Sequence, residues 1–126
     1  MTIVIGYARS ASGEASQLEE QGRRLVEAGV DEVMMDVGSA NSSRPQFQQL
    51  LEKAQAQQVQ EIVVTRFDRL TRNMAELQRL LSLFSEAGIN LRVLDQHLDL
   101  STPQGRLMGN LLQAIAEWET ENFSVI

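Results

Sequence analysis

Short apolar runs alternate along the chain with longer segments in which apolar residues recur every three or four positions. The runs predict buried strands at residues 3–5, 32–36, 61–65 and 90–94. The segments between them predict helices with one apolar face. Strands that alternate with helices indicate an α/β fold. We therefore expect a mainly parallel sheet of four to five strands with helices on both faces.

Helix starts are marked by the polar residues that precede each apolar pattern. Ser16 and Glu19 match a capping box, as do Asn73 and Glu76, and Pro45 suits the first turn of a helix. The first helix is expected to end at residues 28–29 and the helix after Asn73 at residue 88. The expected core face of the first helix consists of Leu18, Gln21, Leu25 and Val26.

The last helix, expected to start at residues 101–103, has a more apolar face than the others. Four of its large residues are spaced by three, four and three positions, which is typical of a seam that packs on a partner helix. These residues are Met108, Leu111, Ile115 and Trp118. We expect them to form a dimer interface or, failing that, to pack on the chain's own sheet.

Composition excludes several classes of protein. The chain has 126 residues, enough for one domain, with no cysteine and one histidine, His97. Disulfides, a thiolate nucleophile and a cluster of histidine ligands are therefore excluded. No glycine-rich phosphate loop and no carboxylate pair is present, so we expect neither a nucleotide cofactor nor a metal. Neither a signal peptide nor a membrane span is visible, and a cytoplasmic location is the default expectation.

The charge distribution is more informative than the net charge of −6, which argues against a general nucleic-acid-binding surface. Ten of the eleven basic residues are arginine. The planar guanidinium group binds phosphate through two hydrogen bonds at once. Five arginines fall in or beside three candidate loops: Arg9, Arg44, Arg66, Arg69 and Arg72. Pairing with the seventeen acidic residues is the plainer interpretation.

Three arginine-bearing motifs occur in order, each where a strand gives way to a helix. They are Tyr7-Ala8-Arg9, Arg44-Pro45 and Asp68-Arg69-Leu70-Thr71-Arg72. Residues 18–21 (Leu-Glu-Glu-Gln) and residues 101–108, which lead to Ala116-Glu117-Trp118-Glu119, add two more. Together the five motifs resemble the catalytic domain of the serine recombinases, the resolvase/invertase family. The resemblance covers nearly the whole chain.

The resemblance implies a chemistry and a set of partners. In this family a serine hydroxyl attacks a DNA phosphodiester and forms a 5′-phosphoserine bond without metal or ATP. The resemblance also implies a homodimer that pairs into a tetramer in the synaptic complex, with no membrane partner. Residues 1–103 would be the catalytic core. Residues 104–126 would begin a long dimerisation helix, cut short before the domain that recognises the DNA sequence.

The resemblance also assigns roles to individual residues. The phosphate-binding arginines of the family correspond to Arg9, Arg44, Arg69 and Arg72. Asp68 corresponds to an aspartate that would orient an arginine or a hydroxyl, and Gln21 to a polar residue near the site. Because Arg44 precedes a proline, it is biased toward an extended backbone and is expected to project from its loop.

The position of the nucleophile departs from the family pattern, because Ala11 stands where the serine is expected. Three interpretations are open. Ala11 replaces the nucleophile, by design or naturally, and the chain is inactive as written. Alternatively, Ser12 takes the role after a one-residue insertion, which restores the family spacing to Gln21. Ser10 is the third candidate.

Ala11 also supports a different class of function, a non-catalytic regulatory or assembly module with the same fold. A flavodoxin-like binder of small molecules is disfavoured because the chain has no phosphate-cradling glycine loop.

Overall fold

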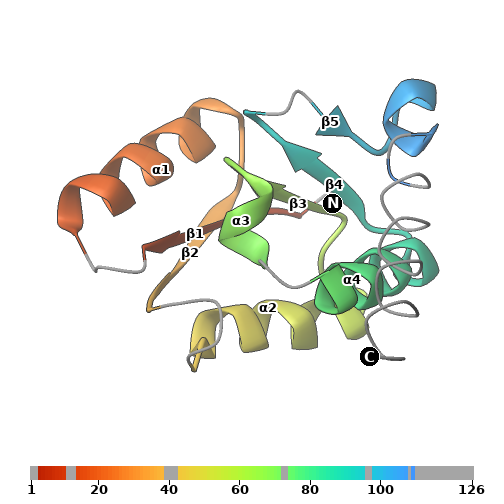
Figure 1. Cartoon of the computed structure of the whole chain (residues 1–126), viewed down its shortest axis with the longest axis horizontal. Helices are drawn as coiled ribbons and strands as arrows, with labels where there is room; N and C mark the ends of the chain where they lie inside the picture. The colour runs from red at the N-terminus through yellow and green to blue at the C-terminus, as the bar shows by residue number, and fades with distance from the viewer. Residues whose placement is uncertain are drawn as a thin grey trace, which may run out of the picture.

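The computed structural model describes residues 3–10, 14–38, 43–71, 74–95, 98–107 and 109. Figure 1 shows their arrangement. The elements in chain order are β1 (Val4–Ser10), α1 (Ala15–Glu27), β2 (Glu32–Val37), α2 (Pro45–Gln55), β3 (Glu61–Val64), α3 (Phe67–Leu70), α4 (Met74–Ala87), β4 (Asn90–Val93) and β5 (Leu98–Asp99). Residues 103–107 are also helical.

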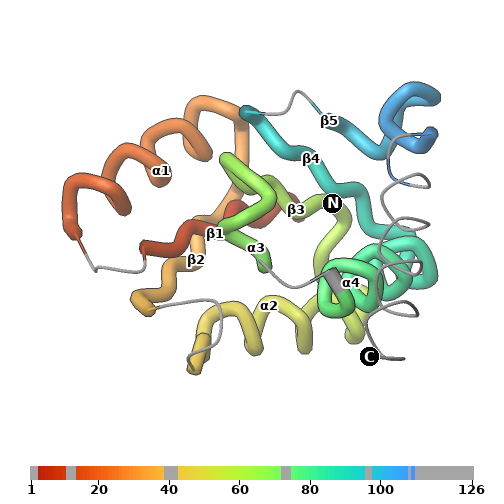
Figure 2. Tube along the Cα trace, viewed as in Figure 1, coloured from red at the N-terminus to blue at the C-terminus, as the bar shows by residue number. Residues whose placement is uncertain are grey.

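The strands form one sheet in the order β2-β1-β3-β4-β5. The first four are parallel, and β5 runs antiparallel to β4. Helix α1 covers one face of the sheet, while α2 and α4 cover the other (Figure 1). The trace in Figure 2 shows β1 in the interior of the sheet, between β2 and β3. The predicted α/β class, with a mainly parallel sheet and helices on both faces, is confirmed.

Each face of the sheet has its own apolar core. The larger core lies under α2 and α4 and includes Phe47, Leu50, Leu80 and Phe84. The smaller one lies under α1 and centres on Ala8, Leu25 and Val63. Helix α1 approaches the sheet closely because Gly6 has no side chain, since a Cβ there would lie 3.1 Å from the Cβ of Leu25. Gly29 and Gly88 have positive φ angles of 94° and 70°, as expected of residues that end helices.

Two expectations about the first helix are wrong. Helix α1 begins at Ala15, its N-cap is Glu14, and no side chain caps it. Ser16 therefore lies inside the first turn. Val26 is 63% exposed, because Leu25 takes the position that faces the sheet and its neighbour is rotated away from it.

Two expectations about loops are also wrong. Strand β1 continues through Ser10, paired in register with Val37 of β2, so Arg9 lies on the strand and not on the turn after it. The arginine-rich turn after β3 contains a short helix, α3. The seam residues Met108, Leu111, Ile115 and Trp118 lie outside the described residues, as does Asn73. The domain boundary at residues 103–104 stays a prediction.

Candidate active site

The carboxyl ends of β1, β2 and β3 lie together at one edge of the sheet. All three strands are parallel and β1 lies between the other two, so their carboxyl ends are neighbours. The next helix after β1, α1, covers one face of the sheet, whereas α4, which follows β3 and α3, covers the other (Figure 1). The point between β1 and β3 is therefore a topological switch point, where open α/β sheets bind ligands.

Arg9 lies at this switch point and is only 2% exposed. Its Nε donates a hydrogen bond to the carbonyl oxygen of Arg69 at 3.1 Å. One terminal nitrogen donates to the carbonyl of Gly38 at 3.0 Å, and the other donates to the carbonyl of Asp68. A buried guanidinium needs such acceptors to offset its lost hydration. The three bonds tie β1 to α3 and to the segment after β2.

The backbone of Arg9 is held in the same way by two side chains. The Arg9 amide donates to Oε1 of Gln21 at 3.1 Å, and Nε2 of Gln21 donates to the Arg9 carbonyl at 2.9 Å. That carbonyl also accepts a hydrogen bond from a terminal nitrogen of Arg69 at 3.2 Å. Gln21, on α1, and Arg69, on α3, thus meet at one peptide unit of β1.

Arg69 retains hydrogen-bonding capacity at this edge. Its Nε is buried and has no hydrogen-bond partner among the described residues. Oδ1 of Asp68 lies 4.0 Å from this Nε and attracts its charge without a hydrogen bond. The same oxygen lies 3.6 Å from Nε of Arg66. Asp68 therefore sits between two guanidinium groups, one on each side along the chain.

Arg44 reaches the same edge from the start of α2. Its backbone is not helical (φ −131°, ψ 77°), as expected of a residue before proline. Its side chain packs inward, with the guanidinium carbon 4.0 Å from the ring centroid of Phe47. One terminal nitrogen donates to the carbonyl of Leu70 at 2.5 Å and the other to Glu76 Oε1 at 3.1 Å. Arg44 thus joins the group through the residue next to Arg69.

Asp36 holds the first turn of α2, which directly follows Arg44 in the chain. The carboxylate of Asp36 is 4% exposed and accepts three hydrogen bonds, from the Tyr7 hydroxyl (2.9 Å) and from the amides of Gln46 (3.0 Å) and Phe47 (2.8 Å). The two amides belong to the first turn of α2, whose N–H groups have no partner within the helix. Burial, and then the bond to Asp36, raise the pKa of the Tyr7 hydroxyl well above its usual value.

Asp36 is not among the site residues predicted from the sequence. The available signal was an acidic side chain at the end of an apolar strand, since a charge in such a place needs buried partners.

The family model for the resolvase N-terminal domain matches residues 4–124. The chain belongs to this family.

Named relatives agree with this assignment. The DNA-invertase BinR of transposon Tn552 from Staphylococcus aureus is 36% identical over 118 residues, which cover 91% of this chain and 60% of the relative. The serine recombinase gin of Escherichia phage Mu is 32% identical over 120 residues, 94% of this chain and 61% of the relative. The chain thus spans about three fifths of the length of these relatives. The recognition of a serine recombinase catalytic domain is confirmed.

Solved structures lead to the same family. The N-terminal catalytic domain of TP901-1 integrase superimposes with a TM-score of 0.83 at 27% identity, covering 95% of this chain and 98% of that one. A resolvase family site-specific recombinase from Streptococcus pneumoniae gives 0.81 at 25% identity, covering 99% and 92%.

The resolvase fold brings together most of the predicted site residues that the structure describes. Arg9, Gln21, Asp68 and Arg69 form one hydrogen-bonded group, and Arg44 adjoins it. Ser10 is fully buried, and its hydroxyl lies 2.9 Å from Oε1 of Gln17, to which it donates. Ala11, Ser12 and Arg72 lie outside the described residues, so their predicted roles stay predictions.

Metal-binding clusters and membrane-spanning helices can be assessed for the described residues of this resolvase-family domain. No group of three or more His, Asp or Glu side chains within them could hold a metal ion. None of the helices that they form is long and apolar enough to cross a membrane.

Proposed function

We propose that this domain cleaves and rejoins DNA as the catalytic part of a site-specific serine recombinase. The observation that carries the proposal is that Arg9 and Arg69 lie together at the carboxyl end of β1, with Arg44 bonded to the residue next to Arg69. Strand β1 ends at Ser10, and residues 11 and 12 come next in the sequence, so the three candidate nucleophile positions lie at or just after this end. Three cations near a serine-bearing segment suit a phosphodiester better than any other common substrate group.

The reaction exchanges one phosphate ester for another. A serine oxygen forms a bond to phosphorus, the 3′ oxygen of the neighbouring nucleotide leaves with a proton, and a 5′-phosphoserine remains. Rejoining runs the same step backward with a 3′ hydroxyl from a partner strand. The ester bond is conserved throughout, so the step needs no external energy source. Guanidinium groups fixed around the phosphate would stabilise the charge that develops in the transition state.

The contacts support different duties for the three described arginines. Arg9 uses its guanidinium to hold the surrounding backbone, so we assign it chiefly to building the pocket. Arg69, with its unpartnered Nε, is the better placed to donate to a phosphate oxygen. Arg44 is the second donor, and by the family resemblance Arg72 is a third. Asp68 would hold the Arg69 guanidinium at the correct edge.

We place the attacking oxygen at position 11 or 12 and not at Ser10. The hydroxyl of Ser10 is buried and bonded to Gln17, so it is unsuited to reach a DNA backbone. If Ser12 is the nucleophile, the chain is active as written. If the position is 11, Ala11 leaves the chain inactive, because a methyl group cannot attack phosphorus.

The proposed partners follow from the reaction. The domain would contact DNA mainly through phosphates, as its net charge of −6 suits a local pocket better than a long groove. Two domains would pair through the seam of Met108, Leu111, Ile115 and Trp118, and two dimers would form the tetramer that exchanges strands. We propose the cytoplasm, where bacterial and phage DNA is found, as the site of action.

The test is formation of a covalent protein–DNA adduct. The domain is fused to a DNA-binding domain of known site and mixed with supercoiled plasmids that carry two such sites around a randomised centre. We expect an adduct that survives denaturation for the chain as written or for Ala11→Ser. Arg69→Gln should abolish it, whereas Arg23→Gln, on the exposed side of α1, should not. Absence of an adduct from both proteins would contradict the proposal.

Ala11 is the observation that favours a second candidate, a non-catalytic assembly module. It predicts that Ala11→Ser forms no adduct and leaves the oligomeric state unchanged.

A further inference from the structure

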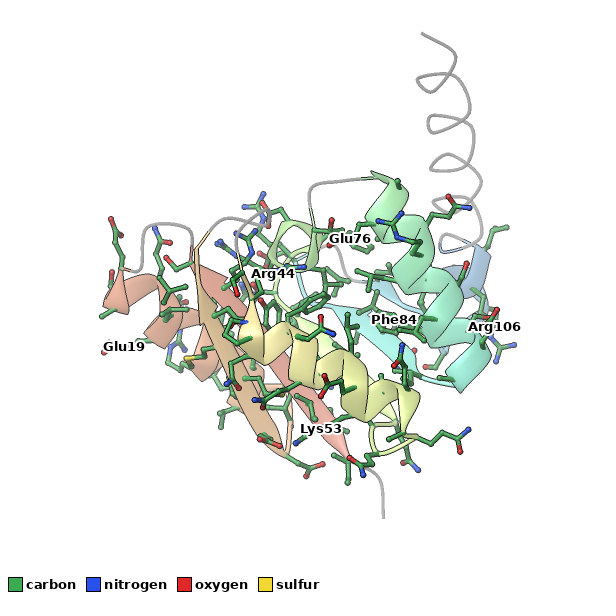
Figure 3. The ribbon with its side chains drawn as sticks, turned by 90° about the horizontal axis from the view of Figure 1, so that it is seen from below. Glu19, Arg44, Lys53, Glu76, Phe84 and Arg106 are labelled. Carbon is green, nitrogen blue, oxygen red and sulfur yellow. The ribbon has the colours of Figure 1, made fainter. Side chains whose placement is uncertain are left out.

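Glu76 lies at the entrance to the Arg44 side of the pocket. It occupies the first turn of α4, and its Oε1 is 3.1 Å from a terminal nitrogen of Arg44. The Glu76 side chain is 31% exposed, whereas that of Arg44 is 7% exposed. Figure 3 shows the two residues at neighbouring ends of α2 and α4. The carboxylate therefore lies nearer to solvent than the guanidinium that it contacts.

A groove leads to this ion pair from outside. It has a volume of about 370 Å³ and lies between α2 and α4, lined by Arg44, Phe47, Gln48, Glu76 and Arg79 together with leucines. A phosphate in this groove would lie near the carboxylate of Glu76 as well as near the guanidinium groups of Arg44 and Arg79. Like charges repel, so the carboxylate raises the free energy of the phosphate complex.

Glu76 is not needed to orient Arg44. The guanidinium plane rests on the ring of Phe47 at 4.0 Å, and one terminal nitrogen is held by the Leu70 carbonyl. Those two contacts fix both the plane and the rotation of the group. The remaining contact, with Glu76, occupies the terminal nitrogen that a phosphate oxygen would otherwise take.

We propose that Glu76 restrains Arg44 by occupying one of its terminal nitrogens and competes with the DNA phosphate for it. This inference rests on the proposed function, because it concerns Arg44, one of the residues proposed to bind the DNA phosphate. In the absence of DNA the Glu76 carboxylate satisfies Arg44. When a phosphodiester enters, one oxygen of the phosphate replaces Oε1 of Glu76, and the carboxylate turns toward solvent. The restraint lowers the affinity for isolated phosphates and favours DNA that is already held at several points.

Phosphate binding to Arg44 tests this directly. Inorganic phosphate is titrated into the domain at constant ionic strength while the Nε–H signals of Arg44 and Arg69 are followed by NMR. Their assignment comes from Arg44→Lys and Arg69→Lys. For Glu76→Gln we expect half-saturation of the Arg44 signal at about fivefold lower phosphate, the factor for loss of a partly exposed ion pair worth about 1 kcal/mol.

The matched control is Glu86→Gln. Glu86 is exposed near the other end of the same helix, and the substitution changes the net charge equally. It should leave the half-saturation point unchanged. A general charge effect would shift the half-saturation point equally in both variants, and that result would contradict the proposed competition. In an Arg44→Gln background, Glu76→Gln should leave the response of the Arg69 signal to phosphate unchanged.

The outcomes separate this inference from the proposed function. Suppose that Arg44 and Arg69 respond to phosphate in the unsubstituted domain, but Glu76→Gln leaves the phosphate affinity of Arg44 unchanged or lowers it. The proposed competition by Glu76 is then wrong, while the proposed phosphate site is still supported. If neither signal responds in any variant, the phosphate pocket itself is wrong, and the restraint fails with it.

Discussion

At the scale of single residues, the site depends on polar side chains that are buried and hydrogen-bonded to distant segments. Asp36 shows why. Its carboxylate joins Tyr7 of β1 to the first turn of α2. It thereby fixes the backbone position of Arg44, the N-cap of that helix. The sequence motifs included Tyr7 and Arg44 but gave no reason to connect them. That connection depends on a strand pairing, β1 with β2, that brings positions far apart in the chain into contact.

Tyr7 offers a pH test of this buried pair. Since the pKa of Tyr7 is raised, the folded state holds the phenolic proton more tightly than the unfolded state. The stabilisation is complete below the usual tyrosine pKa of 10.0 and is lost as pH rises beyond it. Tyr7 is the one tyrosine of the chain, so tyrosinate absorbance reports it alone. We expect no ionisation near that value until the protein unfolds.

The control is the same titration in strong denaturant, where Tyr7 should ionise at its ordinary pKa. Ionisation of the native protein at that same pH would show that the hydroxyl is not buried against Asp36.

At the scale of elements, hydrophobic periodicity was sufficient to predict the four parallel strands and the three long helices between them. It could not predict details that depend on tertiary contacts. β1 extends to Ser10 because β2 pairs with it that far, and α3 forms in a stretch too short for periodicity to reveal. The motifs did place Arg9, Arg44 and Arg69 in the regions where strands give way to helices. The buried, bonded state of Arg9 was not predictable, because it depends on carbonyls from two distant segments.

Arg9 should therefore stabilise the elements around it. Replacement by methionine leaves the carbonyls of Gly38, Asp68 and Arg69 without their donor. We expect the free energy of unfolding to fall by about 3 kcal/mol, since each unsatisfied buried group costs about 1–3 kcal/mol. Urea denaturation measures the loss, and hydrogen exchange should accelerate in α3.

Arg23→Met is the matched control, because the ion pairs that Arg23 makes with Glu20 and Glu27 on α1 are exposed. Its effect should stay within about 0.5 kcal/mol. Equal losses for the two variants would show that Arg9 does not hold the site together.

At the scale of the whole molecule, the described residues of this resolvase-family domain gather arginines at the switch point of the sheet. The acidic net charge suits the proposed binding of a single phosphate better than binding along a groove. The division into a catalytic core and a dimerisation helix stays a prediction from the family resemblance. Periodicity alone could not decide whether the seam packs on a partner or on the domain's own sheet.

Ile115→Glu decides between those two places for the seam. If the seam joins two protomers, light scattering should show that the variant is monomeric under conditions where the unsubstituted chain associates. Val26→Glu is the matched control, since Val26 is apolar and exposed and belongs to α1, outside the predicted seam. An unchanged mass for Ile115→Glu, or a loss of folding, would indicate an internal packing face.

The central claim is that a serine directly after β1 attacks a DNA phosphate held by arginines. It is tested most directly by mass spectrometry of the peptide that carries the DNA in the covalent adduct. The account predicts a phosphoserine at Ser12 in the chain as written, or at position 11 in Ala11→Ser, joined to the 5′ end of the broken strand. Linkage to Ser10, linkage to a 3′ phosphate, or no adduct in either protein would contradict it.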